Sequence, residues 1–170
     1  AYMKPDLERG NLLLMKNEDL WFYVKRTKRP IRITPIQRLS GATSFGDLAR
    51  LDWSVDYSIE KMTEGKDTIN GRKTDIYMFD LKAKTKSATY QRIKLTIDKI
   101  NYRPLYSEVY LISGKLYKTL IFTKYEKIKG SVINTQIKFI DNFSKGKESI
   151  IDFKNVKKEK KIPSRYYLKK

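Results

Sequence analysis

The chain carries few of the side chains on which enzyme chemistry depends. It contains no His and no Cys. A histidine general base, a thiolate nucleophile, the common zinc sites and a Ser-His-Asp triad therefore cannot be built from this chain alone. We predict a protein that is not an enzyme and that has neither a cofactor nor a metal site.

Carboxylates are the remaining groups that could catalyse a reaction. Glu108 and Glu126 fall on predicted strands among lysines, which is typical of solvated cross-strand partners rather than of a paired-carboxylate site. The glycine-containing stretch 40–46 lacks the Lys-Ser/Thr of a P-loop and the spacing of a dinucleotide fingerprint. Neither pattern changes the prediction of a binding protein.

The net charge of +18 favours an anionic partner, such as nucleic acid or an acidic membrane surface. Lys outnumbers Arg, however, although Arg is the preferred reader of phosphates and base edges. We therefore do not expect nucleic acid as a partner. A basic run near the end of the chain is either a solvated surface or a docking site for a membrane or a protein partner. Its members are Lys157, Lys158, Lys160 and Lys161.

The stretch 90–143 supplies the elements that would position a binding surface. Its apolar residues fall at every second position, which predicts strands with one apolar face. Reversals at 101–104, 113–115, 129–131 and 144–146 each contain Gly or Pro and predict an antiparallel meander. The opposite face is expected to be mixed, with Thr96, Thr119 and Lys138 beside Tyr106 and Ile121.

Further strands are predicted at 11–16, 19–26, 31–34, 54–67, 76–82 and 148–155. Pro30 marks an edge strand or a strand start, and Asn70-Gly71 predicts a type I′ hairpin turn. The segment 40–53 is the one predicted helix, with Ser44 as its cap. Roughly ten strands and one short helix make the chain mostly antiparallel β. Its 170 residues are expected to form one domain.

Several segments in order resemble the bacterial outer-membrane lipoprotein-sorting protein family, the LolA-like group. They are the strand Asp19–Val24, the triplet Ile31–Ile33 and the stretch Gly41–Arg50. Downstream, the likeness continues through Asp56-Tyr57, Asp98-Lys99, Asn101–Leu105, Gly114–Leu120 and Ile162-Pro163. The resemblance covers about Gly10 to Leu168, and it is carried more by the order of the motifs than by any single one.

This resemblance implies a strongly curved, unclosed antiparallel sheet, a half-barrel with a short helix or helical loop on its concave side. It implies a single LolA-like β domain over residues 1–170 that lacks the family's N-terminal helix and first strands. It also implies a non-enzymatic periplasmic or cell-envelope protein that shields acyl chains of lipoproteins or another lipid, in lipoprotein sorting or envelope sensing. A membrane surface or an envelope protein would be a further partner.

The apolar positions of the predicted sheet are the candidates for a hydrophobic groove, and core packing is the alternative for each of them. A different class of function also stays open, namely a module that binds a protein or an anionic polymer through a basic outer face. The groove candidates are Trp21, Tyr23, Tyr77, Phe79, Leu95, Ile97, Val109, Leu120, Phe122, Ile137 and Phe139.

Overall fold

The computed structural model describes residues 9–16, 19–34, 53–85, 88–143 and 146–157. The chain divides into two compact units, one of residues 1–51 with 159–170 and one of residues 52–158, and each is described by itself. The predicted helix over 40–53 lies, apart from Trp53, outside the described residues. The expectation of a single domain stays a prediction.

The first unit contains a three-stranded antiparallel sheet in the order β1-β2-β3. Its strands are β1 (Leu12–Lys16), β2 (Asp19–Val24) and β3 (Arg29–Ile33). Pro30 lies in β3, which among the described strands pairs only with β2, so its missing N–H costs no bond on the other side. This confirms the predicted edge strand. Leu20 and Ile33 pair across β2 and β3, and both are buried.

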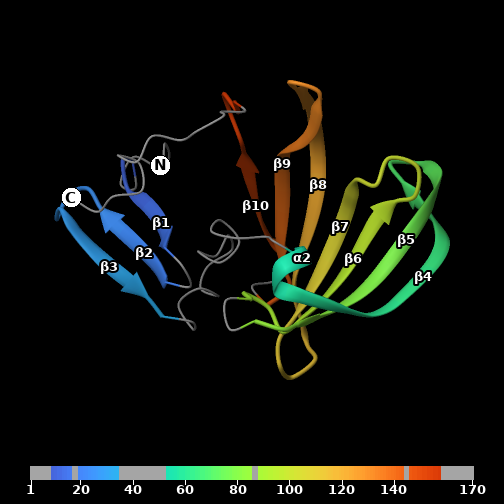
Figure 1. Cartoon of the computed structure of the whole chain (residues 1–170), viewed down its shortest axis with the longest axis horizontal. Coiled ribbons are helices and arrows are strands. Elements are labelled where there is room, and N and C mark those ends of the chain that lie inside the picture. Colours follow the sequence, from blue (N-terminus) through green and yellow to red (C-terminus); the bar gives the residue numbers. More distant parts are fainter. Residues whose placement is uncertain (1–8, 17–18, 35–52, 86–87, 144–145, 158–170) are drawn as a thin grey trace. The chain divides into compact units, whose positions relative to one another are not determined.

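The second unit contains a seven-stranded antiparallel sheet in the order β10-β9-β8-β7-β6-β5-β4 (Figure 1). β4 and β10 are its two edges, so the curved sheet is not closed into a barrel. This confirms the predicted mostly β half-barrel. The strands are β4 (Tyr57–Ile69), β5 (Arg72–Ala83), β6 (Arg92–Asp98), β7 (Pro104–Tyr110), β8 (Leu116–Ile128), β9 (Ser131–Asp141) and β10 (Lys147–Asp152).

A helix of one turn, α2 (Trp53–Asp56), leads into the edge strand β4. The Trp53 ring meets the Phe122 ring edge-on, with 5.7 Å between the centroids. Such an edge-to-face contact places α2 against the sheet face that carries Phe122. β4 itself pairs with β5 along its whole length and bulges between Ile59 and Lys61.

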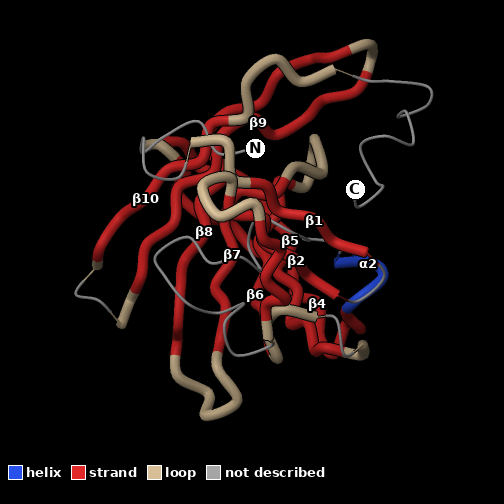
Figure 2. Tube along the Cα trace, turned by 90° about the vertical axis from the view of Figure 1, so that its left-hand side faces the viewer, coloured by secondary structure: helices blue, strands red, loops and turns tan. Residues whose placement is uncertain are grey.

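Two-residue turns join β4 to β5 and β8 to β9, and Figure 2 draws the turns and loops in tan. Asn70 and Gly71 have φ angles of 50° and 77°, as a type I′ turn requires, so this prediction is confirmed. Lys129 and Gly130 adopt nearly the same pair of angles, 45° and 82°. Each of these two-residue loops fixes the register of the two strands that it joins.

The register aligns side chains in rows that cross the large sheet. One row runs Leu81, Ile93, Val109, Lys118, Asp141, and the next runs Phe79, Leu95, Ser107, Leu120, Phe139. Most of these side chains are buried, which confirms the predicted apolar face. The pattern stops before Leu111, because β7 ends at Tyr110 and Leu111 begins the turn to β8.

The opposite face of the sheet holds a small buried cluster that the sequence pattern does not predict. Ile76 and Thr96 are only 2% and 4% exposed. Tyr106, on β7, donates from its hydroxyl to the Asp67 carboxylate on β4 at 2.8 Å. Because the side chains meet across β5 and β6, they cover this part of the face. Thr96 therefore lies on the mixed face, as expected, but it is buried there.

We predict that Tyr106→Phe destabilises the fold by about 0.5–1.5 kcal/mol at neutral pH, because the bond to Asp67 is lost. Burial raises the pKa of Tyr106 above its ordinary value of 10.0, and the bond to Asp67 raises it further. The neutral hydroxyl therefore contributes its full stabilisation below the pKa that Tyr106 has in the unfolded chain. This contribution is lost as the pH rises through the higher pKa that Tyr106 has in the folded protein.

Denaturant unfolding at pH 7 and above pH 10 measures the difference in unfolding free energy between the wild type and Tyr106→Phe. This difference should be smaller at the higher pH. Tyr102→Phe is the matched control, since the Tyr102 ring is 70% exposed, and its effect should stay within about 0.5 kcal/mol. Equal stability of wild type and Tyr106→Phe at pH 7 would show that the hydroxyl does not hold β7 to β4.

Candidate functional site

The candidate site is the apolar face of the seven-stranded sheet, where the structure gathers most of the predicted groove residues. Tyr77, Phe79 and Ile97 are half-buried on this face. Trp21 and Tyr23 lie apart from them in sequence, on β2 of the other unit, and are half-buried there. The buried members are Leu95, Val109, Leu120, Phe122, Ile137 and Phe139.

Burial on this face falls off toward the edge strand β4. Ile59 and Met62 stand opposite Leu81 and Phe79 on β5 and therefore point to the same face. Their side chains are 62% and 54% exposed. An apolar surface that is buried over β6–β9 is thus open to solvent at β4. Exposed apolar patches of this kind mark binding sites more often than isolated apolar residues do.

Aromatic rings extend this open part of the face. The centroids of Tyr77 and Phe79 lie 6.2 Å apart, and Tyr102 stacks on Tyr77 at 6.5 Å with an interplanar angle of 9°. Tyr102 stands in the β6–β7 turn and is 70% exposed. We call these five residues, Ile59, Met62, Tyr77, Phe79 and Tyr102, the apolar margin.

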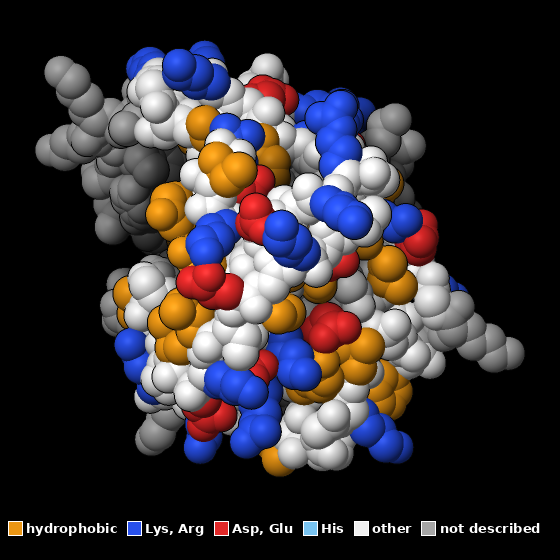
Figure 3. Space-filling model, turned by 90° about the vertical axis from the view of Figure 1, so that its right-hand side faces the viewer, with side chains coloured by type: hydrophobic (Ala, Val, Ile, Leu, Met, Phe, Trp, Pro, Cys, Tyr) orange, Lys and Arg blue, Asp and Glu red, His pale blue; other side chains and the backbone are white. Residues whose placement is uncertain are grey.

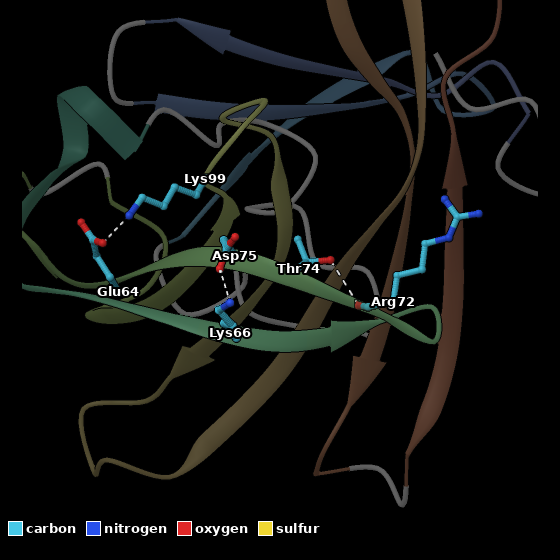
Figure 4. Close-up of polar contacts among 6 residues, drawn as sticks. All are labelled: Glu64, Lys66, Arg72, Thr74, Asp75 and Lys99. Carbon is cyan, nitrogen blue, oxygen red and sulfur yellow. Dashed lines mark hydrogen bonds and ion pairs between the residues drawn. The ribbon is translucent and has the colours of Figure 1, made fainter.

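Ion pairs hold the polar groups beside the apolar margin (Figure 4). Lys99 bonds to the Glu64 carboxylate, and its Nζ lies 5.1 Å from the centroid of the Tyr77 ring. The hydrogen bond to Glu64 raises the pKa of Lys99 above its ordinary value. Lys66 on β4 pairs with Asp75 on β5 at 3.6 Å. The charges next to the margin are therefore largely compensated within the sheet.

Polar side chains interrupt the buried part of the apolar face, and the apolar alternation did not predict them. Lys118 and Asp141 stand opposite each other on β8 and β9, with exposures of 0% and 5%. Ser107 is 1% exposed between Leu95 and Leu120. The signal was present in the sequence, because each lies two positions from a predicted apolar residue and so shares its face.

Several of these polar groups have partners within the sheet. Asp141 accepts from the Phe143 N–H at 2.8 Å, and the Lys118 ammonium lies 5.0 Å from the Tyr117 ring centroid. Thr135, also buried, donates its hydroxyl to Glu126 at 3.1 Å. The Ser107 hydroxyl, in contrast, has no hydrogen-bond partner among the described residues.

The two carboxylates considered for catalysis serve as local partners. Glu108 accepts from the Tyr110 hydroxyl at 2.7 Å and stands opposite Lys94. Burial raises the pKa of Tyr110, and this bond to Glu108 raises it further. Glu126 accepts the hydrogen bond from the Thr135 hydroxyl. Within the described ranges, no group of three or more potential ligands could hold a metal ion.

Basic side chains are mixed with acidic and apolar ones on the side of the molecule shown in Figure 3. Some basic residues are paired, as in Lys82–Glu60 at 3.4 Å and Lys138–Glu148 at 2.7 Å. Of the predicted docking residues, Lys157 is exposed. Lys158, Lys160 and Lys161 lie outside the described residues. In the part of the chain that the structure describes, no helix is both long and apolar enough to cross a membrane.

The matches to known proteins cover nearly the whole chain. A protein-family model described as "Uncharacterized protein" matches residues 1–170. The comparison with curated proteins gives no significant match. Among solved structures, the chain is similar to a LolA superfamily protein from Nitrosomonas europaea. The two are 31% identical with a TM-score of 0.78, over 98% of this chain and 74% of that one.

Two further solved structures show likeness of fold. A DUF1329 family protein from Desulfovibrio piger has a TM-score of 0.80 at 22% identity, over 99% of this chain and 73% of that one. A domain described as outer membrane lipoprotein-sorting, from Vibrio parahaemolyticus, has a TM-score of 0.77 at 19% identity, over 97% and 72%. The half-barrel of this chain is thus shared with distant sequences.

The two parts of the apolar face should respond differently to truncation. We expect Phe139→Ala, at a fully buried position, to lower the free energy of unfolding by about 3–5 kcal/mol. Met62→Ala, on the apolar margin, should change it by about 0.5 kcal/mol or less. Denaturant unfolding of both variants checks this, and comparable losses would show that the margin is core rather than accessible surface.

Proposed function

The chain belongs to the LolA superfamily, and from this premise we propose that it is a non-enzymatic lipid-binding protein. The proposal is supported by the likeness to a LolA superfamily protein and to a domain described as outer membrane lipoprotein-sorting. The ligand that we propose is one or more acyl chains, carried by a lipoprotein or by another lipid, held on the apolar face of the seven-stranded sheet.

The observation that carries this proposal is the continuity of the apolar face from buried to exposed. Phe79 on the apolar margin stands opposite Leu95, and the same row continues through Leu120 to Phe139. An acyl chain needs such a wall because its binding is non-directional and gains roughly 0.8 kcal/mol for each buried methylene. The exposed margin supplies the place at which a chain can first contact this wall.

The basic residues of the protein are compatible with lipid binding, but they do not specify the lipid. Lys99 beside the margin is paired with Glu64, and Arg103 lies 5.6 Å from the centroid of the Tyr125 ring. Basic residues near an anionic lipid surface contribute about 1 kcal/mol each. A module for anionic polymers has less support, because acidic and apolar side chains are mixed with the basic ones on the face in Figure 3.

We also propose a periplasmic or cell-envelope location, which the likeness to a domain described as outer membrane lipoprotein-sorting supports. Acyl chains are exposed to water only when a lipid or lipoprotein leaves a membrane, and a carrier or sensor in the envelope would shield them there. A membrane surface or an envelope protein that delivers or accepts the lipid is the partner that this function requires.

Displacement of a fluorescent fatty acid by unlabelled lipid tests the proposal. Met62→Asp and Phe79→Asp should each weaken binding about tenfold or more, because a charge on the margin would have to be desolvated by the chain. Both positions are at least partly exposed, so these variants should fold. Substitutions at Phe122 or Phe139 are less suited, since both are buried.

Ile112→Asp is the matched control, because Ile112 is 89% exposed in the β7–β8 turn, away from the apolar face. It should bind the probe as the wild type does. Mass spectrometry of solvent extracts from the purified protein would identify lipid that copurifies. Absence of saturable binding, or equal binding by all three variants, would rule out the apolar face as a lipid site.

A further inference from the structure

The Ser107 hydroxyl is a buried polar group at the centre of the apolar face. Ser107 is 1% exposed, and its Oγ makes no hydrogen bond to any residue that the structure describes. It stands directly opposite Leu95 on β6 and Leu120 on β8. Directly opposed residues on one face of an antiparallel sheet have neighbouring side chains, so the hydroxyl points among leucines.

Such a group requires an explanation, because an unsatisfied buried hydroxyl opposes folding. Other hydroxyls on the sheet are used, as Thr135 shows by donating to Glu126 at 3.1 Å. An alanine at position 107 would fit the same space without the unpaired group. The hydroxyl therefore has a cost in the free protein that a bound group could remove.

We propose that Ser107 donates a hydrogen bond to the carbonyl oxygen of a bound acyl chain. The inference rests on the proposed function and specifies its ligand class as ester- or amide-linked acyl chains, in preference to alkyl chains without a carbonyl. Ligand sites are commonly apolar walls with a few polar groups that fix orientation. Leu95 and Leu120 beside Ser107 supply the wall, and the hydroxyl sets how far the chain enters.

Two probes that differ by one carbonyl test this assignment. They are a hexadecanoyl monoglyceride and the hexadecyl glyceryl ether, each used to displace a fluorescent alkyl probe. A single neutral hydrogen bond predicts that the wild type binds the ester about three- to tenfold more tightly than the ether. Ser107→Ala should bind both with equal affinity, and its affinity for the ether should match that of the wild type.

Thr135→Val is the matched control, since it removes a buried hydroxyl that already has a partner. It should keep the preference for the ester and should lower the midpoint of thermal unfolding. Ser107→Ala should leave that midpoint unchanged or raise it, because it removes an unsatisfied group. A loss of ester preference in Ser107→Ala therefore could not come from unfolding.

A second pair of probes distinguishes free lipid from protein-borne acyl chains: a synthetic diacylated lipopeptide and its dialkyl ether analogue. A preference for the acyl form in either pair, lost in Ser107→Ala, supports the assignment and identifies the source of the carbonyl. Equal binding of both members of each pair by the wild type overturns the role of Ser107 but leaves the lipid-binding function intact. Failure of every probe to bind overturns both.

Discussion

The in-phase register of the large antiparallel sheet is the constraint on which the rest of the structure depends. A shift by one residue in any strand from β5 to β9 would turn its apolar set to the opposite face. The register is fixed locally by two-residue loops, such as Lys129-Gly130, whose left-handed angles suit a hairpin. Because the register holds, rows such as Leu95-Ser107-Leu120-Phe139 cross the sheet as one surface.

The same constraint explains why the apolar face can have two roles. In the middle of the sheet each side chain has neighbours on both adjacent strands, and Val109, Leu120 and Phe139 are fully buried. At β4 the described part of the chain provides neighbours on one side only, and Met62 stays open to solvent. Buried core and exposed apolar surface are thus successive parts of one face, so core packing is compatible with the proposed binding of acyl chains.

Much of this fold could be predicted because it depends on local signals. The alternation in Ile93 and Leu95, the Asn70-Gly71 turn and Pro30 on an edge strand each act over a few residues. Burial of Thr96 could not be predicted, because it depends on Tyr106 reaching Asp67, thirty-nine positions away. Ser107 and Lys118 lie at positions that alternate with the apolar residues and so share their face. Their burial was not predicted, because the pattern counts only apolar residues.

The edge strand β4 affects the tendency of the protein to associate with copies of itself. It is 13 residues long, and within the described part of the chain its backbone ladder runs only to β5. An open edge of that length is a template on which another copy could stack in a growing fibril. The bulge between Ile59 and Lys61, with Glu60, Glu64 and Lys66 along the strand, interrupts the template. Solubility at high concentration therefore depends on these charges and this irregularity.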